Sequence, residues 1–459
     1  MVIQNLSRDV IIEQLTSMRY SSQRLEDNTR ERLIRYYQHD NTASFVRTYF
    51  KGTSLQQIPT FTSNFTKRVI DARALVYKKA PEVMVDEKYT DYTGSLNSKR
   101  RQMEKMTYLL GTSAMLSKPH TKWYEGMEEL TYDIIPYFRL FFLVGHDYPC
   151  AIAYPVSNYV PDDGYNLNKG TVWAVWTADY DSYKGEHFLF DGKNTIAPET
   201  DGVVNEEMIN PYGILPVSFS SRMMRLGGDF MVPGAEDVIK TNHQMDIALT
   251  ELALAYRFDA VGIKWIKGAE EITQIDSGVD KFILIPQEAD IGRLGSATLS
   301  QLIDTVKFIT EQCLQNNKLS VKWAGAGGQA KSAEALKMEN IDNMEEREAN
   351  AEDIWRVWEN ERFEIDRRIL EVMGTPIAED YRVNFTEPTP PMSQKEEREQ
   401  WQWELDNNFV TPRDYLKWKN PDISEEELDE RLGVIEIANQ PKVGNGSLLQ
   451  SLATPVVSA

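Results

Sequence analysis

The chain has 459 residues, of which 41% are hydrophobic and 10% aromatic, so it is long enough to bury a large core and to form two or three domains. No apolar run reaches the roughly 20 residues of a membrane-spanning helix, so we expect no membrane partner. The cysteines are Cys150 and Cys313, and the five histidines are scattered. The sequence therefore predicts no disulfide framework, no metal site and no cofactor.

The formal charge of −20 is unevenly distributed along the chain. Residues 334–436 hold 29 acidic and 13 basic side chains, whereas residues 1–100 carry more Lys and Arg than Asp and Glu. Tight DNA binding requires many contacts between basic side chains and phosphates. The charge therefore argues against an ordinary DNA-binding protein. It fits either a solvated helical surface or a surface that repels a polyanion and keeps it mobile.

Apolar positions three and four residues apart predict helices within residues 6–50, 64–80 and 96–118. Asn64 is expected to cap the second of these segments, and Pro81 to end it.

From Thr131 to Val217 the pattern changes to short runs typical of β-strands. Asp191-Gly192 is a hairpin signal, and a strand is expected after Pro216. The other predicted strands are residues 132–135, 139–144, 171–176 and 186–191.

Two apolar-faced segments of similar length, 235–258 and 298–319, predict an antiparallel pair of helices. The first would be about 36 Å long at 1.5 Å per residue. The insert between them has β-runs at Val261–Ile266 and Lys281–Ile285, so we expect a small β-module at the far end of the pair.

A glycine loop follows the second helix, with Gly325, Gly327 and Gly328 close to Lys331-Ser332. It comes near the phosphate-binding pattern of nucleotide hydrolases, but Ala330 stands where the last glycine of that pattern belongs. A helix rather than a strand is predicted before it. A degenerate P-loop NTPase thus stays an alternative, and no catalytic residue is assigned. The side chains of the loop that are able to contact phosphates or to stack are Lys322, Trp323, Gln329 and Lys331.

Ser332 is expected to cap a very long acidic helix whose apolar stripe runs to Val372 and which Gly374 ends. Trp355 and Trp358 lie on that stripe. A helix of this length must lie across other elements or other subunits to bury both indoles, so we take them as candidates for a subunit interface.

In their order and spacing, four stretches resemble the portal proteins of tailed bacteriophages, also called head–tail connectors. The stretches span nearly the whole chain: 64–81, Asn210-Pro-Tyr-Gly-Ile-Leu-Pro-Val217, Ser332-Ala-Glu-Ala-Leu-Lys337, and 385–413 with its Phe385-Thr-Glu-Pro388 start. Ser332-Ala333 departs from the Ser-Gly of many portal proteins, which implies a stiffer start to the long helix.

The resemblance implies an α+β, mainly α fold with a portal-type wing, stem, clip and crown. The implied parts are a wing at 1–233, stem helices at 234–259 and 298–319, a clip at 260–297, a channel loop at 320–332, a long wing helix and strand at 333–387, a crown at 388–440 and a flexible tail at 441–459.

The implied function is a ring of about twelve subunits at one capsid vertex, closed by one heterologous interface repeated around the axis. Double-stranded DNA would pass through it during packaging by the large terminase and again during ejection. Implied partners are the terminase, major capsid and scaffolding proteins, and a head-completion or tail adaptor protein. The implied location is the virion, with the host cytoplasm during assembly. Another ring-forming virion protein, of the tail or capsid, is the structural alternative.

Overall fold

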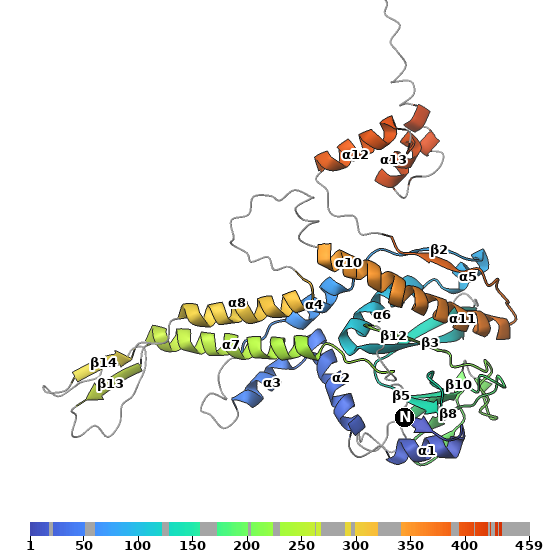
Figure 1. The fold of residues 1–459 in the computed structure, drawn as a ribbon, viewed down its shortest axis with the longest axis horizontal. Coiled ribbons are helices and arrows are strands. Elements are labelled where there is room, and N and C mark those ends of the chain that lie inside the picture. The colour runs from blue at the N-terminus through green and yellow to red at the C-terminus, as the bar shows by residue number, and fades with distance from the viewer. Residues whose placement is uncertain are drawn as a thin grey trace, which may run out of the picture. The chain divides into compact units, whose positions relative to one another are not determined.

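The computed structural model (Figure 1) comprises two compact units, residues 1–329 with 338–388, and residues 330–337 with 389–459. Within them the structure describes residues 1–17, 22–50, 60–121, 128–156, 172–200, 203–223, 230–261, 263–267, 290–294, 299–319, 341–386, 394–407, 409–420, 423, 427–429 and 431–433.

The first unit begins with helices that confirm most of the predicted N-terminal pattern. They are α1 (Arg8–Ser17), α2 (Ser22–Gln38), α3 (Thr42–Tyr49), α4 (Phe65–Arg73), α5 (Glu87–Tyr92) and α6 (Leu96–Leu110).

Two predicted helix ends are wrong, each for a tertiary reason. Helix α4 stops at Arg73 rather than at residue 80, because the buried carboxylate of Glu104 accepts the backbone N–H groups of Val76 and Tyr77 at 2.8 and 3.0 Å. These bonds hold the chain outside a helical path. Helix α6 stops at Leu110 rather than at residue 118.

Gly111 ends α6 because its φ of 84° lies in the left-handed region, and a Cβ there would be 2.0 Å from the carbonyl oxygen of Val232. The chain then enters strand β3 (Thr112–Thr121), which the helical prediction for 96–118 missed. Strand β3 is the centre of a three-stranded sheet, between β12 (Val217–Ser221) and β4 (Glu128–Ile135).

A six-stranded sheet has the order β1-β5-β6-β7-β8-β9 and contains the predicted strands 139–144, 171–176 and 186–191. Its strands are β1 (Val2–Ile3), β5 (Arg139–Leu143), β6 (Ala151–Pro155), β7 (Trp173–Thr177), β8 (His187–Phe190) and β9 (Thr195–Ile196). Strand β1 is parallel to β5, and the other pairs are antiparallel. The Asp191-Gly192 turn joins β8 to β9, which confirms that hairpin. Ile11 and Leu15 of α1 are buried in the same core as this sheet.

Two short antiparallel strand pairs also belong to the first unit. Strand β2 (Glu82–Met84) pairs antiparallel with β15 (Arg382–Asn384), and β10 (Glu199–Thr200) with β11 (Val203–Val204). The first of these pairs joins segments far apart in the sequence.

The predicted long helix is present over the described residues 341–372, where α10 (Ile341–Asn350), a π-helical turn (Ala351–Trp355) and α11 (Arg356–Val372) follow without a break. This length is about 48 Å at 1.5 Å per residue. Gly374, at φ 85°, follows its end as predicted, whereas Ser332 lies outside the described residues.

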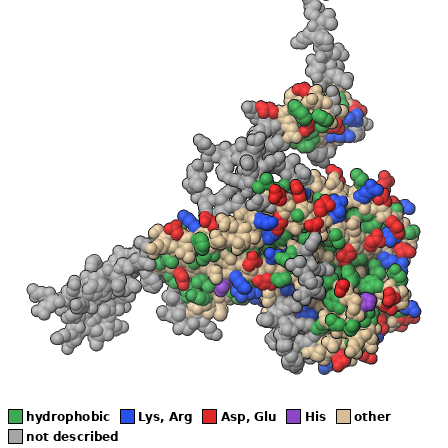
Figure 2. Space-filling view, viewed as in Figure 1, with side chains coloured by type: hydrophobic (Ala, Val, Ile, Leu, Met, Phe, Trp, Pro, Cys, Tyr) green, Lys and Arg blue, Asp and Glu red, His purple; other side chains and the backbone are tan. Residues whose placement is uncertain are grey.

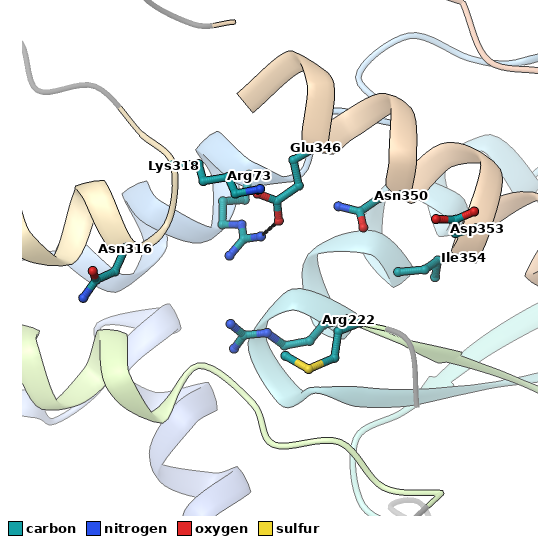
Figure 3. Close-up of a pocket in the computed structure, with 9 residues that line it drawn as sticks. Arg73, Arg222, Asn316, Lys318, Glu346, Asn350, Asp353 and Ile354 are labelled. Carbon is teal, nitrogen blue, oxygen red and sulfur yellow. Dashed lines mark hydrogen bonds and ion pairs between the residues drawn. The ribbon is translucent and has the colours of Figure 1, made fainter. Parts of the chain in front are cut away.

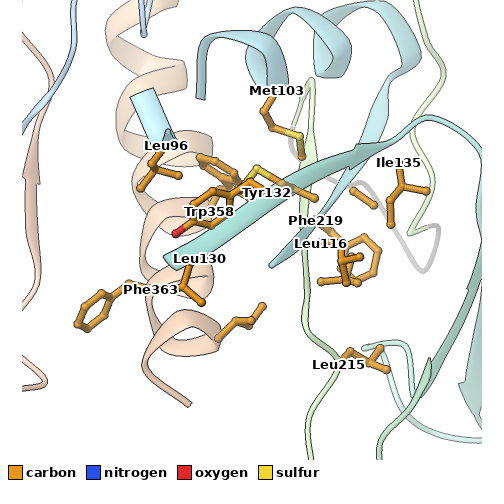
Figure 4. Packing of buried hydrophobic residues seen from close by; sticks show 14 of the residues in the cluster. Leu96, Met103, Leu116, Leu130, Tyr132, Ile135, Leu215, Phe219, Trp358 and Phe363 are labelled. Carbon is orange, nitrogen blue, oxygen red and sulfur yellow. The ribbon is translucent and has the colours of Figure 1, made fainter. Parts of the chain in front are cut away.

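Trp355 and Trp358 are each only 1% exposed in the single chain, so the inference that they need another subunit is wrong. The ring of Tyr77 packs edge-on against both indoles, at centroid distances of 5.2 and 6.2 Å. Trp358 lies among the side chains that α6 and the three-stranded sheet contribute to the main core (Figure 4). Tertiary neighbours of the same chain therefore supply the surface that the helix lacks.

A buried ionic network fastens α11 to α6 beside this core. The guanidinium of Arg100 donates to both oxygens of Glu359, at 2.6 and 2.9 Å, and Arg362 donates to Glu359 and Asp366. Burial opposes the charge of Glu359, but the two arginines outweigh it and hold its pKa well below the usual value. Hydroxyl groups complete the network: Tyr77 and Tyr381 donate to Glu359, and Tyr89 and Tyr132 donate to Asp366.

We predict that Glu359→Ala lowers the free energy of unfolding by about 3 to 5 kcal/mol, because it removes the carboxylate that pairs with the buried Arg100 and one of the two that pair with the buried Arg362. Urea unfolding followed by circular dichroism measures this loss. The matched control is Glu364→Ala on the same helix, where the ion pair with Arg367 is exposed and contributes about 1 kcal/mol or less. Equal effects of the two substitutions would contradict the role given to the network.

Candidate functional site: the helical hairpin and the pocket at its base

Two long antiparallel helices, α7 (Glu236–Val261) and α8 (Leu299–Asn316), extend from the body of the first unit (Figure 1). They confirm the predicted pair 235–258 and 298–319. At their far end β13 (Ile263–Lys267) pairs antiparallel with β14 (Asp290–Leu294). Strand β13 falls in the predicted run Val261–Ile266, but its partner is β14, which the sequence did not indicate; Lys281–Ile285 lies outside the described residues.

Side chains of α7 anchor the hairpin to the start of α4. The amide oxygen of Asn242 accepts from the backbone N–H and the hydroxyl of Thr66, both at 2.9 Å. Asn64 was expected to cap α4, but its side chain makes no capping bond. The side chain of Asn242, on α7, caps α4 instead. Its buried amide oxygen needs a hydrogen-bond donor, and the N–H groups at the start of a helix need an acceptor.

Asp246, one turn further along α7, holds the segment just before α4. Its Oδ1 accepts from the backbone N–H and the hydroxyl of Ser63, at 2.8 and 2.9 Å, and its Oδ2 accepts from Asn242 at 3.1 Å. Burial raises the pKa of Asp246 to about 6, although the bonds from Ser63 favour the charged form. The Asp246 carboxyl therefore titrates near pH 6.

The hairpin buries some of its side chains between its helices and leaves several large apolar side chains exposed. Met245 and Cys313 are buried where the two helices meet, and burial raises the pKa of the Cys313 thiol, so the thiol stays protonated and inert. In contrast, Phe308 on α8 is 62% exposed, and Ile303 and Tyr256 are exposed as well. These three side chains are the large apolar groups that the described part of the hairpin leaves exposed.

A pocket of about 340 Å³ lies at the base of the hairpin (Figure 3). It collects side chains from α4, α8 and the long helix, and from the segment after β12. They are Arg73, Arg222, Met223, Asn316, Lys318, Glu346, Asn350, Asp353 and Ile354.

Three cations surround the pocket, and they are not equally neutralised. Glu346 pairs with Arg73 and, at 3.3 Å, with Lys318. Arg222 instead donates to a neutral group, the carbonyl oxygen of Gly234, at 2.6 Å. Burial, together with the nearby charge of Arg73, lowers the pKa of Arg222. A half-buried guanidinium in this setting attracts an oxyanion, because a planar pair of N–H donors matches carboxylate and phosphate oxygens.

The predicted loop residues Lys322, Trp323, Gly325, Gly327, Gly328, Gln329 and Lys331 all lie outside the described residues. The element before them is helix α8 and not a strand, as predicted, so the strand that precedes a true phosphate loop is missing there. Sequence reasoning did not find the pocket. Its cations Arg73, Arg222 and Lys318 are far apart in the chain and follow no motif.

Among the described residues, no group of three or more His, Cys, Asp and Glu side chains is placed to hold a metal ion. In the same part of the chain, no helix combines the length and the apolar character that crossing a bilayer requires.

No protein-family model matches the sequence, and a comparison with curated proteins finds no match. A solved structure described as the neck of an empty gene transfer agent particle, computed with C6 symmetry, is similar over 82% of this chain and 92% of that chain, with 12% identity and a TM-score of 0.35. A structure described as the virion of a native gene transfer agent particle is similar over 82% of this chain and 91% of that chain, with 11% identity and a TM-score of 0.35. Similarity at this level establishes neither a shared fold nor a shared function.

We predict that acid stabilises the anchoring of α7 through Asp246. The folded pKa, about 6, lies above the unfolded value near 3.9, so the contribution of this group is complete below about pH 4 and is lost as pH rises through 6. Unfolding free energies of the parent and of Asp246→Asn, measured from pH 4.5 to 7.5, should show the parent losing stability relative to the variant. Asp304→Asn, at an exposed position of α8, is the control for removal of a charge. A difference between parent and Asp246→Asn that does not change with pH would contradict the assignment.

Proposed function

We propose that the chain is the subunit of a portal-type ring in a virion, through which double-stranded DNA is packaged and later ejected. The observation that supports this most is the projecting hairpin of α7 and α8, with exposed apolar side chains on its helices and a β-hairpin at its tip. The order of elements also agrees with the resemblance in sequence to portal proteins. The chain itself is proposed to carry out no chemistry.

Exposed apolar side chains on the hairpin support the proposed ring. The core of the first unit is complete within one chain, since even Trp355 and Trp358 are buried there. Phe308, Ile303 and Tyr256 remain exposed on the hairpin, and a neighbouring copy of the chain is the occupant we propose for them. One heterologous contact repeated around an axis closes a ring, here of about twelve subunits.

The DNA path is proposed to run beside the hairpin base. Helix α8 and Lys318 lead directly into residues 320–332, the proposed channel loop, and the pocket places Arg222 next to this point. The net charge of −20 repels DNA from most of the surface. A few cations at one level then give local phosphate contacts without tight binding.

The remaining partners follow from the same proposal. The terminase is expected to dock on the β13–β14 end, and capsid, scaffolding and adaptor proteins on the outside of the ring. The protein is thus assigned to the virion, after assembly in the host cytoplasm.

We predict that the purified chain forms a species of about twelve times its 52.7 kDa mass in mass photometry, without nucleotide. Phe308→Ser should shift the distribution towards monomers, because it removes an apolar contact between copies. Gln312→Ser, at an exposed polar position of the same helix, should not. A parent protein that stays monomeric at micromolar concentration over a range of salt would contradict the proposal. A ring without an axial opening in electron micrographs would favour another type of virion ring.

We further predict that the pair Arg222→Gln and Lys318→Gln leaves ring assembly intact but weakens the contact with DNA. Binding of a short duplex to the ring, measured by fluorescence anisotropy at several salt concentrations, should lose affinity and salt dependence together, because fewer counterions are released. Lys307→Gln, exposed on α8 away from the pocket, is the matched control. Equal binding by all three proteins would show that the pocket does not meet DNA.

A further inference from the structure

In the described part of the second unit two short helices are followed by helical residues 427–429 and 431–433, and few side chains there are buried. Helix α12 (Gln394–Asp406) is followed by α13 (Pro412–Lys419), whose N-cap Thr411 forms a capping box with Asp414. Of the side chains described in this unit, Leu428 is the one that is buried. The described part of this unit therefore buries little apolar surface, and association is one way in which small units gain stability.

Aromatic side chains of this unit lie at its surface. Trp403 stacks on Phe409 with a centroid distance of 5.5 Å, yet the two are 59% and 70% exposed. Trp418 is exposed too, and it contacts the half-buried Trp401 at 5.0 Å. In Figure 2 hydrophobic atoms form a patch on the visible face of this unit, with acidic and basic atoms beside it. Exposed tryptophan and phenylalanine in contact with each other are typical of the centre of a protein interface.

The charges of the two helices differ in sign. Helix α12 carries five acidic and two basic side chains, and α13 carries three basic and one acidic. One copy of the unit therefore presents both an acidic and a basic helix. A second copy, turned so that its α13 meets α12 of the first, places opposite charges around the aromatic patch.

We propose that the C-terminal unit docks head to tail onto the same unit of a second copy, with Trp403 and Phe409 at the centre of the contact. The proposal rests on the ring proposed above and adds a second contact between its subunits. A second copy is the occupant that the observations favour. It supplies apolar surface and the complementary charge at once, and a heterologous contact of this kind repeats around a closed ring.

The test uses the full-length chain with Trp403→Ser and Phe409→Ser combined. The concentration at which half of the protein is assembled, measured by mass photometry on dilution, should rise by about tenfold or more, because these side chains occupy the centre of the contact. Gln400→Ser, exposed on the same helix, should leave it unchanged. An unchanged value for the aromatic variant, in a parent protein that does form rings, overturns this inference and leaves the ring proposal standing; a parent that forms no ring overturns the ring proposal itself.

A charge exchange guards against local unfolding of the aromatic variant. Lys417→Glu with Lys419→Glu in one chain and Glu399→Lys with Glu404→Lys in another should each weaken assembly, and mixing the two chains should restore it, because opposite charges then face each other only between copies. Hydrogen–deuterium exchange of residues 394–420 should be slower in rings than in monomers. Equal exchange rates in rings and monomers would overturn the inference, as would a failure of the charge exchange to restore assembly.

Discussion

The buried ionic network around Glu359 is the interaction on which the rest of the first unit depends. Two carboxylates and two guanidinium groups are removed from water there, so each must be paired in the position that it occupies, and this fixes how α11 lies on α6. The indoles of Trp355 and Trp358 are buried beside it. The network thereby helps to complete the core of the body within one chain. Phe308 stays exposed on the projecting hairpin, and single apolar side chains such as Val2 and Met84 stay exposed on the body.

The hairpin is tied to that body by polar bonds rather than by apolar packing alone. Asn242 accepts a hydrogen bond from the start of α4, and Asp246 accepts one from the segment before it. Removal of either acceptor leaves buried polar groups unpaired. Such a joint holds α7 in one orientation. A helix held in a fixed direction, with Phe308 exposed on its antiparallel neighbour, is suited to make the same contact with each neighbouring copy.

Charge adds a second level of organisation to the proposed ring. The chain is acidic as a whole, whereas Arg73, Arg222 and Lys318 converge on one pocket, where they outnumber the carboxylates of Glu346 and Asp353. On this proposal the acidic surface repels DNA along most of its path, and the cations of the pocket attract it at one position along the axis. The opposite charges of α12 and α13 act between subunits instead, where they favour one orientation of the contact.

Local patterns in the sequence determined the elements whose causes are local. Helical periodicity predicted the pair 235–258 and 298–319, alternation and turn residues predicted strands such as β4, β5, β7, β8 and β12, and Gly374 predicted the end of the long helix. Only the tertiary structure decided where α4 ends, what caps it and what covers Trp355, because Glu104, Asn242 and Tyr77 act across long separations in the chain. The pocket around Arg222 has the same origin: its charges converge through folding, and no spacing along the sequence records that convergence.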